Sequence, residues 1–318
     1  GMTAREAGFA QAAISAQLKR LHVSAPAQFS SESFVSLEDR QANTKLAMEG
    51  VKELGKKIVE AIRAALKSLR EAVKNFWIKI TDTAGRLAKR AQELIKVVAD
   101  KKGDPKVDFL YGGAIKVAQW LSAGAKTQDW PKQAAAVSKA SYAVLGFAKN
   151  VRTGLSQLAE GKEMRMPELD TSVFANLPQG AKLVKAGGDS FGYKLEVEKS
   201  REGANDKYDM LKKEQMKTIL GIVAEVATQL SVYRKEWAQT EAALDGALKK
   251  MEAKADSSAY EVNDMQKSIQ SKFTKAARSA LSLPQTWSSY ALRVLNGYVS
   301  IAALCVKHWD AEPEKATK

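Results

Sequence analysis

One long stretch, Val51–Lys102, decides the fold: VKELGKKIVEAIRAALKSLREAVKNFWIKITDTAGRLAKRAQELIKVVADKK. Its apolar residues recur mostly three and four positions apart, which is the spacing of one stripe along an α-helix. The stripe consists of Val51, Leu54, Ile58, Ile62, Leu66, Leu69, Val73, Phe76, Ile80, Leu87, Ala91, Leu94 and Val98. This pattern predicts a long amphipathic helix over 50–102, with a bend where helix propensity falls at Thr81–Gly85. The helix should end at Gly103 and Pro105. A stripe this narrow favours packing against another helix.

The remaining faces of this helix are basic. Residues 50–102 hold fourteen Lys/Arg and six Asp/Glu, a net charge of +8, within a chain of 318 residues whose formal net charge is +14. Without a recognition-helix motif, we expect any DNA contact to be made with phosphates, independently of base sequence. The predicted phosphate-binding residues are Lys52, Lys56, Lys57, Arg63, Lys67, Arg70, Lys74, Lys79, Arg86, Lys89 and Arg90. A solvated helix face is the alternative interpretation.

Few residues in the chain could carry catalytic or metal chemistry. One cysteine, Cys305, excludes an intrachain disulfide, and two histidines leave too few ligands for a Cys/His zinc site. Cys305 and His308 could form a nucleophile pair on one helix, but a buried structural thiol is the favoured interpretation. Acidic pairs such as Glu236 and Glu241 are interpreted as solvated charges. We therefore predict no catalytic residue, no metal, no cofactor and no enzyme activity.

Six tryptophans are spread over the predicted helices. Interleaved with Lys and Arg, they could stack on single-stranded bases, although core packing is favoured. They are Trp77, Trp120, Trp130, Trp237, Trp287 and Trp309. No run of about 18 apolar residues is evident, so we expect no membrane insertion.

The whole pattern predicts an all-α fold, an elongated bundle of long helices with one small β-hairpin insert. The leader-like segment 1–49 has no net charge and precedes a basic helical part, 50–160, which includes shorter helices at about 111–123 and 129–160. Residues 161–203 contain the hairpin, with strands at 181–186 and 190–197. Residues 204–318 form a long antiparallel helical hairpin, from about 205 to 255 and from about 258 to 309, interrupted or kinked at Pro284.

Three short tripeptides in the leader share one pattern, a small residue, any residue, then glutamate. They are Ser30-Ser31-Glu32, Ser36-Leu37-Glu38 and Ala47-Met48-Glu49, the last followed by Gly50. The pattern resembles the cleavage rule of the prohead proteases of giant tailed bacteriophages. Cleavage after Glu49 would separate the neutral leader from the basic body.

The body also resembles the internal head proteins of those phages, which are virion structural proteins. The resemblance is carried by the Lys-rich helix after Gly50, by the element Asn176-Leu177-Pro178-Gln179-Gly180-Ala181-Lys182-Leu183, and by the helix with Val232-Tyr233-Arg234-Lys235-Glu236-Trp237. It implies a precursor made in the host cytoplasm, packed into the prohead, trimmed by the protease and kept in the capsid interior with DNA and other internal proteins. Ejection with the genome and the oligomeric state stay open.

Two other function classes fit the residues. Long amphipathic helices around a hairpin are also found in membrane-active proteins, including pore-forming proteins and effectors, and Phe76-Trp77 could lie at a membrane surface. A helical adaptor or scaffold that binds another protein is the second alternative.

Overall fold

The computed structural model describes residues 56, 60, 63, 64, 67, 74, 76–122, 125–159, 167–185, 193–198, 207–256 and 274–312. The chain forms two compact units. The first combines Gly1–Glu71, Leu155–Met164 and Ala243–Thr274, and the second combines Ala72–Gly154, Arg165–Ala242 and Lys275–Lys318. Most described residues belong to the second unit.

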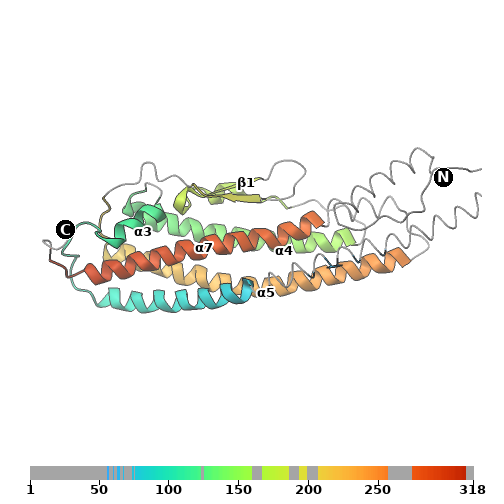
Figure 1. The fold of residues 1–318 in the computed structure, drawn as a ribbon, viewed down its shortest axis with the longest axis horizontal. Coiled ribbons are helices and arrows are strands. Elements are labelled where there is room, and N and C mark those ends of the chain that lie inside the picture. Colours follow the sequence, from blue (N-terminus) through green and yellow to red (C-terminus); the bar gives the residue numbers. More distant parts are fainter. Residues whose placement is uncertain are drawn as a thin grey trace, which may run out of the picture. The chain divides into compact units, whose positions relative to one another are not determined.

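Helices make up most of the described residues (Figure 1). After a helix at 76–100 come α3 (Gly113–Ser122), α4 (Trp130–Ala159), α5 (Lys213–Asp256) and α7 (Thr274–His308), with short 3₁₀ turns η1 (Thr127–Asp129), η2 (Thr171–Phe174) and η3 (Pro178–Gly180). The two strands β1 (Lys182–Lys185) and β2 (Tyr193–Glu196) form one antiparallel hairpin. The predicted class, all-α with a small β-hairpin insert, is confirmed.

The helix at 76–100 is held by the apolar stripe that predicts it. Its buried residues are Trp77, Ile80, Ala84, Leu87, Ala91 and Val98. They lie three or four positions apart in sequence, except for the last two, which are seven apart. The helix is unbroken through 81–85, and the Thr81 and Thr83 hydroxyls donate to backbone carbonyls one turn back. It ends at residue 100 ahead of Gly103, whose φ of +65° suits glycine.

Helix directions in the second unit follow from contacts near the helix ends. Lys213, the first residue of α5, donates through Nζ to the carbonyls of Ala99 (2.7 Å) and Lys101 (2.9 Å) at the end of the helix at 76–100. Near the start of that helix, the Trp77 ring contacts Tyr233, far along α5. The helix at 76–100 and α5 are therefore antiparallel.

The helices α4 and α5 run in the same direction. Ser138 bonds to Glu225 early in both helices, and Arg152 bonds to Glu236 later in both. A parallel pair cannot be joined by a tight turn. The connection between α4 and α5 is long, and its described residues include η2, η3 and the hairpin.

The helix α7 is antiparallel to α4, and therefore also to α5. Its Trp287 donates to Ser141 Oγ at 2.9 Å, and Tyr298 lies beside the carbonyl of Trp130, at the start of α4. The predicted antiparallel arrangement of the last two long helices is confirmed. In the second unit, the helix at 76–100, α4, α5 and α7 thus form a four-helix bundle with one crossover (Figure 1).

The start of α5 differs from its prediction near residue 205. The helix begins at Lys213, because Tyr208 and Met210 are extended and bond with residues 108–110. The carbonyl of Tyr208 accepts from Leu110 N at 2.8 Å, and Met210 N donates to Asp108 O at 2.7 Å. This isolated bridge, Phe109↔Asp209, also shows that the hairpin is not the only extended pairing.

Pro284 lies inside α7 without ending it. The prediction was an interruption or a kink, and an interruption is wrong because the helix continues on both sides of the proline. Ser288 Oγ donates to the Pro284 carbonyl at 2.6 Å. Residues 257–273, which include the predicted start of this helix, lie outside the described residues.

The hairpin is fastened to the helices. Lys182 pairs with Glu196 and Lys185 with Tyr193, as the predicted strands require. Tyr193 packs its ring edge-on against Phe147 of α4. At the strand entry, Tyr290 of α7 donates to the Pro178 carbonyl at 2.6 Å.

Candidate functional site

The described part of the predicted phosphate-binding face is exposed. Eight of its residues are described, and all eight lie at exposed positions of helical segments: Lys56, Arg63, Lys67, Lys74, Lys79, Arg86, Lys89 and Arg90. Lys52, Lys57 and Arg70 lie outside the described residues. The structure therefore leaves the four cations at 79–90 accessible to a phosphate backbone.

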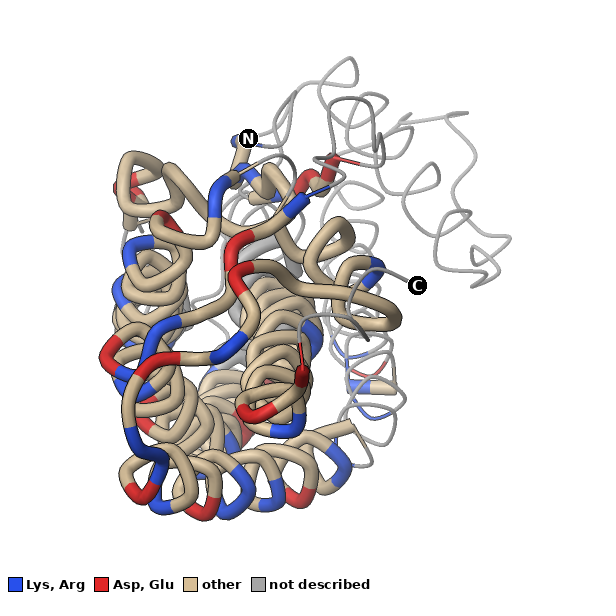
Figure 2. Tube along the Cα trace, turned by 90° about the vertical axis from the view of Figure 1, so that its left-hand side faces the viewer, with Lys and Arg blue, Asp and Glu red and all other residues tan. Residues whose placement is uncertain are grey.

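Acidic residues share this face. Asp82, Glu93 and Asp100 are also exposed, so the helix at 76–100, with five Lys/Arg and three Asp/Glu, has a net charge of only +2. Figure 2 shows Lys/Arg and Asp/Glu interspersed along the described helices. In the first unit, Arg63 pairs with Glu252 at 2.6 Å, and this hydrogen bond raises the pKa of Arg63. In the fold, Arg63 of the basic stretch is thus paired with a carboxylate from another part of the chain.

The predicted processing residues cannot be placed. Ala47, Met48, Glu49 and Gly50 lie outside the described residues, as do Ser30, Glu32, Ser36 and Glu38.

Cys305 lies in the core, whereas His308 is only half-buried. Cys305 is fully buried, and this burial raises the pKa of its thiol to about 12. His308 stacks on Tyr111 with ring centroids 3.9 Å apart, and burial, then the Lys307 charge, lowers the pKa of its imidazole. A thiol with so high a pKa supplies almost no thiolate at neutral pH, which supports the structural interpretation.

The tryptophans mainly fill the core. Trp77, Trp130, Trp237, Trp287 and Trp309 are each at most 8% exposed. Side chains this buried cannot stack on bases, so base stacking by these five is excluded in the folded state.

A partly buried ionic cluster joins α4 to α5, and the sequence analysis did not predict it. Glu236, predicted to be solvated, has a side chain only 13% exposed. Its carboxylate bonds to Arg152 at 2.8 Å and lies 3.7 Å from Lys149. Its partners lie on a helix more than eighty residues away in sequence, so no local signal could have revealed the pairing.

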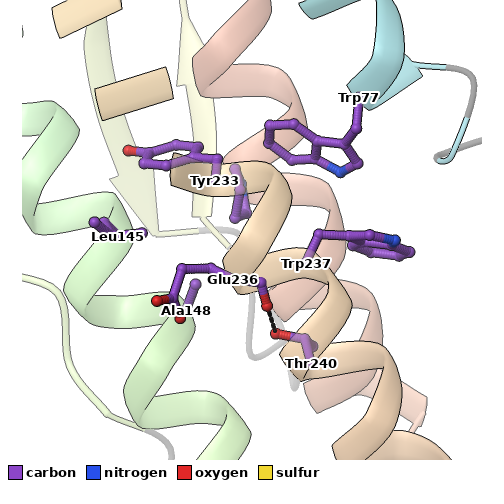
Figure 3. Close-up of a pocket in the computed structure, with 8 residues that line it drawn as sticks. Trp77, Leu145, Ala148, Tyr233, Glu236, Trp237 and Thr240 are labelled. Carbon is purple, nitrogen blue, oxygen red and sulfur yellow. Dashed lines mark hydrogen bonds between the residues drawn. The ribbon is translucent and has the colours of Figure 1, made fainter. Parts of the chain in front are cut away.

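Beside this cluster lies a small cavity of about 20 Å³ (Figure 3). It is lined by Trp77, Leu145, Ala148, Tyr233, Glu236, Trp237, Thr240 and Pro284. Space of this size is comparable to that needed for one water molecule. It is too small for an organic substrate or cofactor. Among the residues that the structure describes, no group of three or more His, Cys, Asp or Glu could hold a metal ion.

One described helix is long and apolar enough to cross a membrane. It is Ser282–His308, and it qualifies by length and composition only, so the expectation of no membrane insertion stays a prediction. In the fold, 61% of its apolar window is buried, as expected for the central helix of a bundle.

The sequence model of the family described as phiKZ-like phage internal head proteins matches residues 1–164 and 158–304. The chain therefore belongs to this family. No curated protein and no solved structure matches it significantly.

Family membership defines the class of protein and its location in the virion. The chain is a bacteriophage virion protein of the capsid interior. The suspected resemblance to internal head proteins is confirmed.

Proposed function

We propose that this internal head protein is packaged with DNA after removal of its leader, and that its basic helix contacts DNA phosphates without reading base sequence. Family membership supports the virion role. The exposure of Lys79, Arg86, Lys89 and Arg90 on one unbroken helix is the observation that carries the phosphate contact. The protein serves as a structural component that neutralises packaged DNA, not as an enzyme.

The phosphate contact is tested by its salt dependence. Each phosphate neutralised contributes about −0.9 to the slope of log K against log salt concentration on duplex DNA. Replacing the four cations at 79–90 by glutamine should lower affinity at about 50 mM salt and flatten the slope by up to about 3.6. Fluorescence anisotropy with two unrelated duplexes of equal length measures both quantities and checks that base sequence has no effect.

A matched control separates local contact from net charge. Lys132 and Lys139 on α4, with Lys235 and Lys249 on α5, are also exposed. Their replacement by glutamine removes the same four charges from other helices. Equal loss in both quadruple variants would contradict a phosphate-binding face on the helix at 76–100, and absence of DNA binding at low salt would refute the contact altogether.

The processing step is tested with the phage's own prohead protease. The proposal expects cleavage after Glu49, releasing a body that begins at Gly50. The variant Glu49→Gln should block that product while leaving the purified chain folded, because the change lies in the leader. Mass spectrometry of the products gives the cleavage position. A body of unchanged length after exhaustive digestion would reject the processing.

Membrane activity is the second candidate, favoured by the apolar stretch Ser282–His308. It would require α7 to leave the bundle that buries most of that stretch. Flotation with anionic liposomes distinguishes the two functions, since a capsid-interior protein should stay at the bottom of the gradient. Flotation at physiological salt would favour the membrane function.

A further inference from the structure

The tripeptide pattern of the proposed processing site recurs in the body. It occurs at 91–93 and, outside the described residues, at 161–163, 200–202 and 259–261. Ala91-Gln92-Glu93 has a small residue two positions before glutamate, as Ala47-Met48-Glu49 does. Among the glutamates that the structure describes, Glu93 alone has such a residue at that position. Cleavage after Glu93 would cut the basic helix in two, so a protease that reads only this pattern would destroy the body that it is proposed to release.

The fold holds this second tripeptide in a packed helix. Ala91 is fully buried, and so is Val98, while Leu87 is 5% exposed. Gln92 and Glu93 themselves are exposed, so the tripeptide presents its glutamate but not its small residue. A protease that recognises both residues must first unwind the helix and pull Ala91 out of the core.

Fraying from the helix end does not reach the tripeptide easily. The Nζ atom of Lys213 binds the carbonyls of Ala99 and Lys101 and so fastens the last turn to α5. Lys101 also pairs with Asp310 at 2.8 Å. Exposure of residues 91–93 therefore requires opening of packed structure on both sides, and cleavage then depends on the rare open state.

We infer that the packing of the helix at 76–100 shields Ala91-Gln92-Glu93 from the prohead protease, so that this position stays uncut although its sequence matches the tripeptide pattern. This inference rests on the proposed processing. It assigns to the packing of this helix a second role, protection of the basic helix from cleavage at Glu93.

The shielding is tested first without the phage protease. A Glu-specific endoproteinase is incubated with the native chain and with the chain unfolded in urea, and the products are identified by mass. Cleavage after Glu93 should be about 100-fold slower or more in the native chain than in the unfolded one. Similar rates in the two states would overturn the inference, whatever happens at Glu49.

The second arm uses the prohead protease with a synthetic peptide of residues 86–98 and with the full chain. The peptide should be cut after Glu93, and the native chain should not. If the peptide also resists, sequence and not fold protects this position, and the inference fails. Cleavage after Glu49 is scored separately in the full chain, so failure of the proposed processing is distinguishable from failure of the shielding.

Discussion

Ser141 offers the sharpest test of the core that joins α4 to α7. It is fully buried; its hydroxyl donates to the Val137 carbonyl at 2.8 Å and accepts from Trp287 Nε1 at 2.9 Å. The variant Ser141→Ala removes the only acceptor that the described structure gives this indole, itself fully buried.

The expected magnitude follows from these contacts. An unsatisfied buried donor costs about 1–3 kcal/mol. Alanine has a higher helix propensity than serine, which offsets up to about 0.5 kcal/mol of this loss in stability. The net loss should be about 1–2 kcal/mol in the free energy of unfolding, or roughly 2–8 °C in Tm for a unit of this size.

Urea denaturation monitored by circular dichroism measures this loss, and Ser138→Ala is the matched control. Ser138 lies one turn earlier on α4, and its bond to Glu225 is exposed, so its replacement should change stability by less than about 0.5 kcal/mol. Phenylalanine has no N–H donor that could lose its acceptor. In a Trp287→Phe background, the further change Ser141→Ala should therefore cost little free energy of unfolding. Equal effects of the two serine variants would refute the reasoning.

Three further perturbations probe other contacts. Arg152→Met leaves the carboxylate of Glu236, 13% exposed, without its closest cation and should cost about 2 kcal/mol in urea denaturation. Gly180→Ala forces alanine to a φ of +57° and places its Cβ against Glu198, so the cost should be about 1–2 kcal/mol. Because burial lowers the pKa of His308, folding favours its neutral form; the stability that this provides is complete above pH 6.5 and should decline as the pH falls below that value.

Each of these has a control that can contradict it. Lys149 is 48% exposed and lies farther from Glu236 than Arg152 does, so Lys149→Met should cost less than about 1 kcal/mol. If both variants lose the same stability, Arg152 is not the main partner of Glu236. Gly221→Ala lies inside α5 at an exposed position, and its added Cβ would meet no atom within 4 Å outside the adjoining helix backbone, so it should instead stabilise the protein by about 0.5–1 kcal/mol. The variant His308→Gln should flatten the pH profile of stability, and an unchanged profile would exclude His308 as its cause.

Local signals predicted most elements of this fold. The steps of three and four in the apolar stripe predicted the helix at 76–100, and Gly103 with Pro105 marked its end. The hairpin also followed from short-range pattern, with β1 and β2 inside the predicted strands. These features depend on neighbours in sequence, which a single chain displays.

The features that the sequence did not predict depend on contacts between residues far apart in the chain. The start of α5 moved to Lys213 because the segment before it pairs with residues 108–110. Burial of Glu236 depends on α4 lying parallel beside α5, which no local pattern encodes. The pairing of Arg63 with Glu252 likewise joins residues far apart in the sequence, so the basic stretch alone did not predict it.

The most direct test of the proposed function is the intact mass and N-terminal sequence of the protein isolated from phage virions. The account predicts a chain that begins at Gly50, with the tripeptide at 91–93 uncut. A virion protein that still begins at Met2 or Thr3 would contradict leader removal. A chain that begins at Leu94 would contradict the protection of the helix.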